Sequence, residues 1–265
     1  MRLPSGSVWL RLATIGTLAF LYVPLAIIVL YAFDTDKTQA WPIQGLTLDW
    51  VGVAFGNGDV RDAFLLSVEV AFAATALALL LGTLASFAVH RYSFFGRGTI
   101  SFLLVLPIAL PGIVTGMALN ATINASGIGF TTFTIIVGHT TFCIVVVFNN
   151  VIARLRRTSR SIEEASMDLG ADTLQTFRYI TFPVIRTALI AGGLLAFALS
   201  FDEVIVTTFT AGTQETIPLW IFDQIQRAHQ LPVVNVVAVF LILLSTIPVY
   251  LAQRLSSDTT GVAGR

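Results

Sequence analysis

The sequence predicts an all-α membrane protein with six transmembrane helices. Of its 265 residues, 55% are hydrophobic and only 11% are charged, whereas about a quarter of the residues in a typical soluble domain are charged. The mean hydropathy is strongly positive, at +0.84. Six separate apolar stretches are long enough to cross a bilayer, since a crossing helix needs roughly 20 residues. We therefore expect a single polytopic domain over residues 1–265.

The predicted spans, in chain order, cover about residues 10–33, 63–89, 99–123, 130–153, 187–208 and 233–252. The first span has arginines near its start, as a signal peptide does, but its apolar part is too long and no small-residue cleavage pattern follows. We expect it to be a retained helix. Kinks are expected where prolines fall inside the spans, because proline removes a backbone donor: at Pro24, Pro107, Pro111 and Pro248.

The charged residues sort to the two sides of the predicted spans. The outer loops hold only three of the fifteen basic residues, Lys37, Arg61 and Arg227. The inner side holds the other twelve: Arg2, Arg11, Arg91, Arg97, Arg154, Arg156, Arg157, Arg160, Arg178, Arg186, Arg254 and Arg265. The positive-inside rule then places both termini in the cytoplasm. The outer loops are acidic, with Asp34, Asp36, Asp49, Asp59, Asp62, Glu215 and Asp223.

Two short apolar features leave alternatives open. The outer run Ile217–Phe222 is too short to span and suits an interfacial or re-entrant helix, which serves either as a membrane-surface anchor or as a contact surface for a partner. Gly112 and Gly116 have the small-xxx-small spacing that lets helices approach closely. That approach occurs either within the chain or at a subunit interface.

The inner loop of residues 154–186 is too structured for a simple connector. Ile162, Ala165 and Leu169 recur at helical spacing in an otherwise charged segment, which predicts an amphipathic helix. Gly170 is expected to end this helix in a left-handed conformation. Asp172 and Gln175 have the spacing of a capping box, which predicts a second short helix that ends near Pro183. The two helices would meet at a glycine corner beneath the membrane.

The same loop resembles the EAA loop of ABC importer permeases, whose pattern is E-A-A-x3-G-x9-I-x-L-P. The matching residues here are Glu164-Ala165-Ser166, Gly170 and Ile180-Thr181-Phe182-Pro183, with Ser166 and Phe182 as conservative departures. The resemblance implies a type I importer membrane domain in a bacterial inner membrane. It also implies contact with an ATPase subunit, so that ATP-driven closure moves the membrane helices. The implied ATPase-coupling residues are Glu164, Ala165, Ser166, Gly170, Ile180 and Pro183.

Further residues point to a branch of that family. The runs Ser200–Val204 and Phe209–Gly212, with Pro218-Leu219 following, are most similar to the spermidine/putrescine permeases. The resemblance implies a complex with two copies of an ABC ATPase subunit, a second related permease and a periplasmic or extracellular solute-binding protein, embedded in a lipid bilayer. Nucleic acid is not an expected partner.

No ATP-binding signature of the G-x-x-x-x-G-K-[ST] type occurs, and Lys37 is the only lysine. We therefore expect no cofactor in this chain, with ATP bound and hydrolysed by a partner subunit, and no enzymatic activity. The three histidines, His90, His139 and His229, fall in different segments, which favours hydrogen-bonding roles over a metal site. The alternatives are an ATP-independent secondary transporter or channel, or an ABC importer of another small solute.

Three acidic residues lie within the predicted spans and are candidates for the substrate path: Glu69, Asp202 and Glu203. A carboxylate in hydrocarbon costs at least a few kcal/mol unless it faces water or a partner. Either these acids accept hydrogen bonds from neighbouring helices, or they line the entrance of the path and attract a cationic substrate such as a polyamine.

Overall fold

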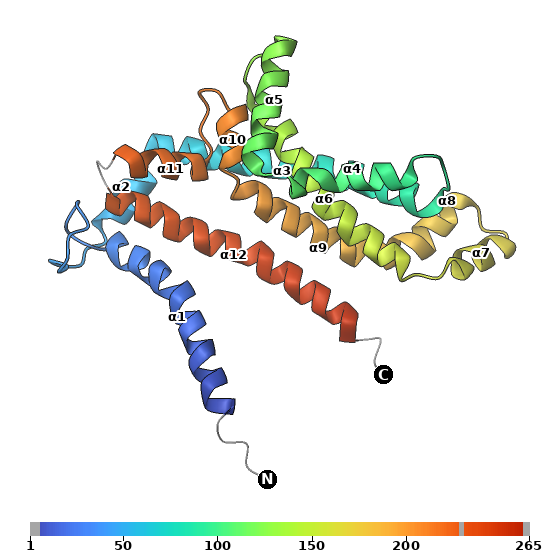
Figure 1. The fold of residues 1–265 in the computed structure, drawn as a ribbon, viewed down its shortest axis with the longest axis horizontal. Helices are drawn as coiled ribbons and strands as arrows, with labels where there is room; N and C mark the ends of the chain where they lie inside the picture. The colour runs from blue at the N-terminus through green and yellow to red at the C-terminus, as the bar shows by residue number, and fades with distance from the viewer. Residues whose placement is uncertain (1–5, 228–230, 262–265) are drawn as a thin grey trace. The chain divides into compact units, whose positions relative to one another are not determined.

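The computed structural model describes residues 6–227 and 231–261, and every regular element in these ranges is a helix. Figure 1 shows them in chain order. The chain divides into two compact units: a smaller unit of residues 1–61 and 221–243, and a larger unit of residues 62–220 and 244–265. The helices are α1 (Gly6–Ala32), α2 (Asp49–Gly56), α3 (Gly58–Arg91), α4 (Arg97–Ala109), α5 (Gly112–Ser126), α6 (Thr132–Arg156), α7 (Arg160–Asp168), α8 (Thr173–Thr176), the π-helix η1 (Phe177–Thr181), α9 (Phe182–Phe201), α10 (Ile205–Thr210), α11 (Ile217–Arg227) and α12 (Leu231–Gly261).

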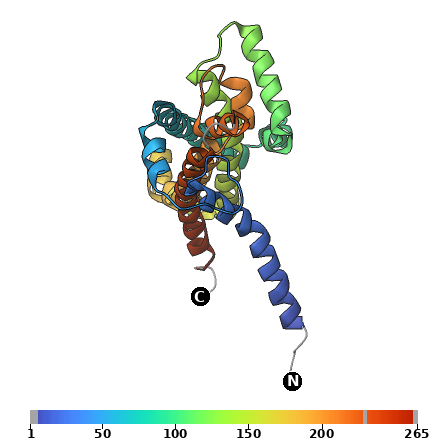
Figure 2. The ribbon, with the colours of Figure 1, turned by 90° about the vertical axis from the view of Figure 1, so that its left-hand side faces the viewer.

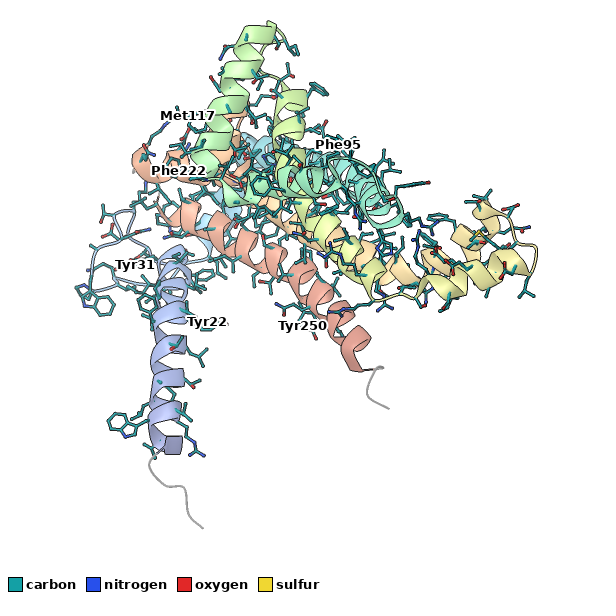
Figure 3. All side chains as sticks on the ribbon, turned by 45° about the vertical axis from the view of Figure 1, so that its right-hand side comes forward. Tyr22, Tyr31, Phe95, Met117, Phe222 and Tyr250 are labelled. Atoms are coloured by element: carbon teal, nitrogen blue, oxygen red, sulfur yellow. The ribbon has the colours of Figure 1, made fainter. Side chains whose placement is uncertain are left out.

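The predicted all-α membrane class is confirmed. Five helical segments are long and apolar enough to cross a membrane, and the bent pair of α4 and α5 makes a sixth if it is counted as one span. Large side chains on these helices are exposed, among them Tyr22 on α1, Met117 on α5 and Tyr250 on α12 (Figure 3). Lipid acyl chains can cover such surfaces, because they are as apolar as the exposed side chains.

The third predicted span, residues 99–123, is not one helix. The chain bends by 106° between its two halves, α4 and α5. Figures 1 and 2 show the two helices pointing in different directions. The break follows from Pro111, which disfavours a helical conformation for the residue before it. Leu110 is accordingly extended, with φ −82° and ψ 145°. The expected kink at Pro111 is therefore a complete break.

The fifth predicted span, residues 187–208, is also interrupted. Helix α9 ends at Phe201, and the chain resumes helical geometry only at Ile205. Asp202 and Glu203 lie in the gap between the two helices. The mean hydropathy of the stretch gave no sign of this gap, because it is dominated by the apolar residues on both sides of the two acids.

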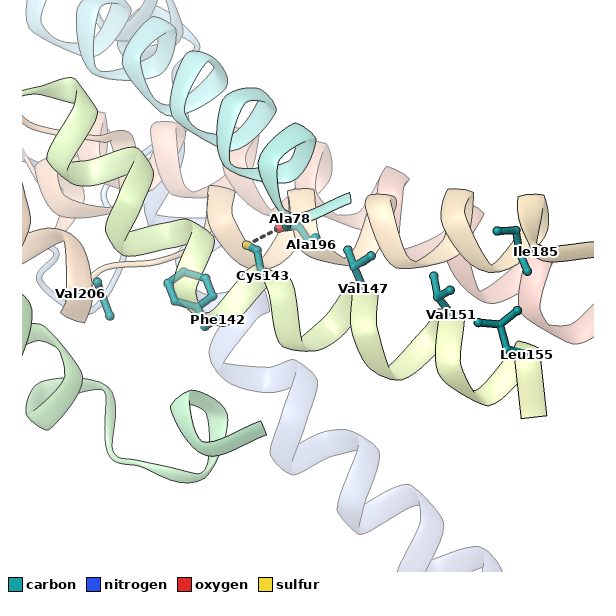
Figure 4. Packing of buried hydrophobic residues seen from close by; sticks show 9 residues of the cluster. All are labelled: Ala78, Phe142, Cys143, Val147, Val151, Leu155, Ile185, Ala196 and Val206. Atoms are coloured by element: carbon teal, nitrogen blue, oxygen red, sulfur yellow. Dashed lines mark hydrogen bonds between the residues drawn. The ribbon is translucent and has the colours of Figure 1, made fainter. Parts of the chain in front are cut away.

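The core of the larger unit is built where α6 and α9 lie side by side (Figure 4). Cys143, Val147, Val151 and Leu155 recur at a spacing of four residues and bury one face of α6. The Cys143 thiol donates to the carbonyl of Ala196 on α9 at 3.3 Å. The remaining members of this cluster are Ala78, Phe142, Ile185, Ala196 and Val206.

Small residues let these helices approach closely. A Cβ built on Gly192 of α9 would lie 3.3 Å from the Cβ of Asn150 and 3.5 Å from the Cα of Val147. A Cβ on Gly82 of α3 would lie 3.0 Å from the carbonyl oxygen of Ile144 on α6. Van der Waals contact of this kind drives helix association in lipid, because the hydrophobic effect does not pull helices together there.

The first turn of α11 differs from both interpretations of the run Ile217–Phe222. Its residues Ile217, Pro218, Leu219 and Trp220 are buried. Leu219 packs in a cluster with Val70 and Ile135 of the larger unit. The predicted short helix exists, but its first turn belongs to the protein core rather than to a membrane surface or an open contact surface.

Labelling of introduced cysteines tests the predicted topology. Arg157, Thr213 and Asp59 are exposed, whereas Cys143 is fully buried. In a Cys143→Ala background, we expect a cysteine at position 157 to react with an impermeant maleimide only from the cytoplasmic side. Cysteines at positions 59 and 213 should react only from outside, because the basic residues gather on the inner side. Reversed labelling would contradict the predicted orientation. Arg2 and Arg265, which contribute to that asymmetry, lie outside the described residues.

Candidate functional site

The loop between α6 and α9 contains a rigid helical corner. Ser159 caps the start of α7, because its hydroxyl accepts from the amide of Ser161 at 3.3 Å. It ends in a Schellman motif: the amide of Gly170 donates to the carbonyl of Met167 at 2.9 Å, and that of Ala171 donates to Ser166 at 3.1 Å. Gly170 has φ +91°, a conformation that costs roughly 1–2 kcal/mol for other L-residues. The predicted left-handed corner is confirmed.

The second helix of the loop starts as predicted but does not end as predicted. Asp172 accepts from the amide of Gln175 at 2.7 Å, and the Gln175 side chain accepts from the amide of Asp172 at 3.0 Å, which completes a capping box. The prediction of an end near Pro183 is wrong, because α8 continues through η1 into α9. Phe182 donates its amide to the carbonyl of Phe177, five residues back. Such a wide π-turn shifts the hydrogen-bond register just before Pro183, which has no amide hydrogen to donate.

Glu163 ties this loop to the rest of the larger unit. Its Oε1 lies 2.7 Å from Nη2 of Arg91, at the end of α3, and accepts from the hydroxyl of Thr181 at 2.6 Å. Arg160 donates to the carbonyl of Arg91 at 3.1 Å. The side chains of Glu163 and Arg91 are only 15% and 24% exposed, so solvent screens this pair less than a surface pair. Sequence analysis missed Glu163, although an arginine at the inner end of a span and two adjacent glutamates gave a signal.

The other side of the loop faces solvent. We call residues 160–176, from α7 through the Gly170 corner to α8, the loop knob. Glu164 is exposed on it and makes no hydrogen bond or ion pair within the described residues. Leu169 is 89% exposed and Leu174 is 72% exposed. These two leucines leave apolar side chains open to solvent on an otherwise charged loop.

The six predicted coupling residues fall into two groups. Glu164, Ala165, Ser166 and Gly170 lie on the loop knob, where the Ser166 hydroxyl is 3.3 Å from that of Thr176 and joins α7 to α8. Ile180 and Pro183 lie beyond it, in η1 and in the first turn of α9. Ile180 is half-buried and Pro183 is exposed. The second group therefore belongs to the membrane helix that the knob adjoins.

The three predicted path acids occupy different environments. Glu203 caps α10, because its Oε1 accepts from the amide of Val206 at 2.9 Å. Asp202 is exposed at the end of α9, and within the described chain its carboxylate has no hydrogen bond or ion pair. Glu69 is exposed on α3 and is likewise unpaired among the described residues. The structure thus supports a structural role for Glu203 and leaves Asp202 and Glu69 open to a ligand.

The break between α9 and α10 is bonded to α6 through His139. Nδ1 of His139 lies 2.8 Å from the hydroxyl of Ser200, and Nε2 lies 2.8 Å from the hydroxyl of Thr207. All three side chains are buried. The predicted hydrogen-bonding role is confirmed for His139. His90 makes no hydrogen bond to another described residue, and His229 lies outside the described residues.

Helix α10 is held closely by α5 and α6. Thr134 donates to the carbonyl of Thr210 at 2.8 Å, and Asn120 donates to that of Phe209 at 2.8 Å. A Cβ on Gly116 would come within 2.5 Å of the Phe209 ring, so only glycine fits there. The Gly112–Gly116 spacing therefore serves close packing within the chain, the first of its two interpretations.

The chain is similar in sequence to known membrane transport proteins. Residues 77–260 match the family of binding-protein-dependent transport system inner membrane components. The spermidine/putrescine transport system permease protein PotC of Haemophilus influenzae is 33% identical over 240 residues, which cover 90% of this chain and 92% of the relative. The putrescine transport system permease protein PotI of Escherichia coli is 33% identical over 232 residues, with coverage of 84% and 82%.

Solved structures match the fold over nearly the whole chain. A bacterial alginate ABC transporter, in complex with an alginate pentasaccharide-bound periplasmic protein, contains a chain with a TM-score of 0.70 and 15% identity. The match covers 96% of this chain and 94% of that one. The family match, the sequence relatives and the fold all point to the same kind of protein. The chain belongs to the family of binding-protein-dependent transport system inner membrane components, and it is a permease subunit of an ABC importer.

Proposed function

We propose that this permease imports polyamines such as spermidine and putrescine. The observation that carries the proposal is the 33% identity, over 90% of the chain, to a permease named for those two solutes. Polyamines are flexible polycations, and a path for them needs negative groups that are not already neutralised by the protein. The unpaired carboxylate of Asp202 meets that need, and Glu69 is a second candidate.

The break between α9 and α10 is a suitable place for substrate contact. Irregular backbone at membrane depth is tolerated where it is buried in protein or lines a water-filled cavity. Discontinuous helices also form the solute sites of many transporters. Asp202 is exposed at such a break, and a carboxylate there would otherwise bear the cost of facing hydrocarbon. We assign it to the aqueous path, where it binds the ammonium groups of the substrate.

The loop knob is the proposed contact for the ATPase subunit. Its exposed Leu169 and Leu174 offer apolar anchors, and the exposed Glu164 on the same knob offers a charge for a basic partner residue. The Schellman motif, the capping box and the Glu163–Arg91 pair hold the knob rigid. Rigidity matters because a force transmitted through a flexible loop would be absorbed by the loop.

The remaining partners follow from the family. We propose that the chain pairs with a second permease, receives solute from a solute-binding protein outside, and engages two copies of an ATPase subunit that binds and hydrolyses ATP. Both termini then lie in the cytoplasm, on the side of the loop knob. The helical path between the two permeases would carry the solute through the inner membrane.

Uptake by acid variants tests the substrate proposal. In proteoliposomes that hold the assembled importer and its binding protein, we expect Asp202→Asn to raise the KM for spermidine about tenfold, the size of one lost charge-assisted contact. Glu203→Gln is the matched control, since its amide oxygen can still accept from Val206. Unchanged KM in a well-expressed Asp202→Asn variant would exclude Asp202 from the path. If the intact complex transports no polyamine, the substrate is another solute and only this part of the proposal fails.

Substitution of Gly170 tests whether the corner transmits force. Gly170→Val should abolish most uptake while the chain still inserts, because a β-branched residue strongly resists the left-handed conformation. A Cβ at this position would meet open space, so the effect would be conformational rather than steric. Gly170→Asn is the control, because asparagine tolerates that conformation. Normal transport by Gly170→Val would show that the knob does not couple ATP hydrolysis to transport.

The two adjacent glutamates separate anchoring from coupling. Glu163→Gln weakens its bonds to Arg91 and Thr181, and we expect it to lower the melting temperature of the complex, at a cost of about 1–3 kcal/mol. Glu164→Gln should leave that temperature unchanged and instead reduce solute-stimulated ATP hydrolysis. Melting is followed by scanning fluorimetry and hydrolysis by phosphate release. Equal effects of the two variants on both measurements would refute this division of roles.

A further inference from the structure

A continuous line of hydrogen bonds crosses the break between α9 and α10. Ser200 lies two residues before Asp202, and Thr207 lies four residues after Glu203. His139 of α6 contacts both hydroxyls, each at 2.8 Å. The Thr207 hydroxyl in turn donates to the backbone carbonyl of Glu203 at 2.8 Å. One buried imidazole therefore joins the two ends of the interrupted helix.

The direction of this line of bonds follows from its last link. The Thr207 hydroxyl has one hydrogen, and it is used on the carbonyl of Glu203. The same oxygen must therefore accept from Nε2–H of His139. In a neutral ring Nδ1 is then the acceptor, and it takes the hydrogen of Ser200. The order is Ser200 to His139 to Thr207 to the Glu203 carbonyl, and each polar hydrogen in it is donated.

The hydrogen-bonded residues are buried, and α6 and α10 approach each other closely beside them. His139, Ser200 and Thr207 are no more than 3% exposed. Gly138, next to His139, brings α6 near α10, since a Cβ there would lie 3.2 Å from side-chain carbons of both Thr210 and Val206. Hydrogen bonds in such an interior are stronger than in water, and a fully satisfied polar network specifies one geometry.

We propose that His139 is a positioning residue for substrate transfer: it fixes the geometry of the break and so holds the Asp202 carboxylate where the cation passes. The inference rests on the proposed role of Asp202 in the path. The Asp202 carboxylate has no hydrogen-bonding partner among the described residues, so its position depends on the backbone between Ser200 and Thr207. His139 is the side chain that bonds both of those residues.

Three variants in the assembled importer test this role. His139→Phe removes both bonds but keeps an aromatic ring beside Phe142, whose centroid lies 5.5 Å from that of His139. His139→Gln restores one donor and one acceptor on a planar amide. Thr140→Val is the matched control, because the Thr140 hydroxyl, among the described residues, bonds within its own helix to the carbonyl of Ile136. Folding is checked by the melting temperature of each complex.

The first measurement reports geometry without substrate. A spin label on a cysteine at position 202, in a Cys143→Ala background, should become more mobile in His139→Phe and remain as in the parent in His139→Gln and Thr140→Val. The second measurement is spermidine uptake. His139→Phe should raise KM about tenfold with little change in maximal rate, as expected when a charge-assisted contact loses its alignment, and His139→Gln should recover most of the loss.

The outcomes separate this inference from the proposed function. An immobile label in a folded His139→Phe complex overturns the positioning role directly. A mobile label with unchanged KM also overturns it if Asp202→Asn does raise KM, since Asp202 would then act without being positioned by His139. If Asp202→Asn leaves KM unchanged as well, the failure lies in the proposed role of Asp202, and the inference falls with it.

Discussion

A bilayer leaves no water for an unpaired backbone group, and this constraint governs the whole structure. Long helices satisfy it automatically, but the chain departs from them at Leu110–Pro111 and at Asp202–Val204. After the second departure, the Glu203 side chain accepts from the amide of Val206 in the first turn of α10, while α5 and α6 bond two carbonyls at its end. An interrupted helix can thus exist at membrane depth only where neighbouring helices complete it.

Outside the membrane the same need is met by short-range motifs. Within the loop knob, the Schellman bonds at Gly170 close the end of α7, and the reciprocal bonds of Asp172 and Gln175 close the start of α8. These motifs use residues three to five positions apart. The knob therefore keeps its shape largely by itself, and the Glu163–Arg91 pair only orients it against α3.

This difference explains what the sequence could predict. The Gly170 corner and the capping box were predicted correctly because their signals are local, and the apolar stretches gave the class and the approximate spans. The end of α9 was predicted wrongly because average hydropathy cannot register two acids among many apolar residues. The partners of Glu163 and His139 could not be predicted, since they are 72 residues away at Arg91 and 61 and 68 away at Ser200 and Thr207. Such pairings depend on how helices are rotated against one another.

The continuity of α8, η1 and α9 relates the two functional regions to each other. Residues Thr173–Phe201 form one helical segment of 29 residues, about 43 Å long at 1.5 Å per residue. The loop knob adjoins one end of this segment, and the Asp202 break with its bonds to His139 follows the other. The π-turn keeps the segment continuous past Pro183, where an α-helical register would lose a bond. The segment packs along α6, so under the proposed coupling a displacement of the knob would be transmitted along the segment to the break that His139 bonds.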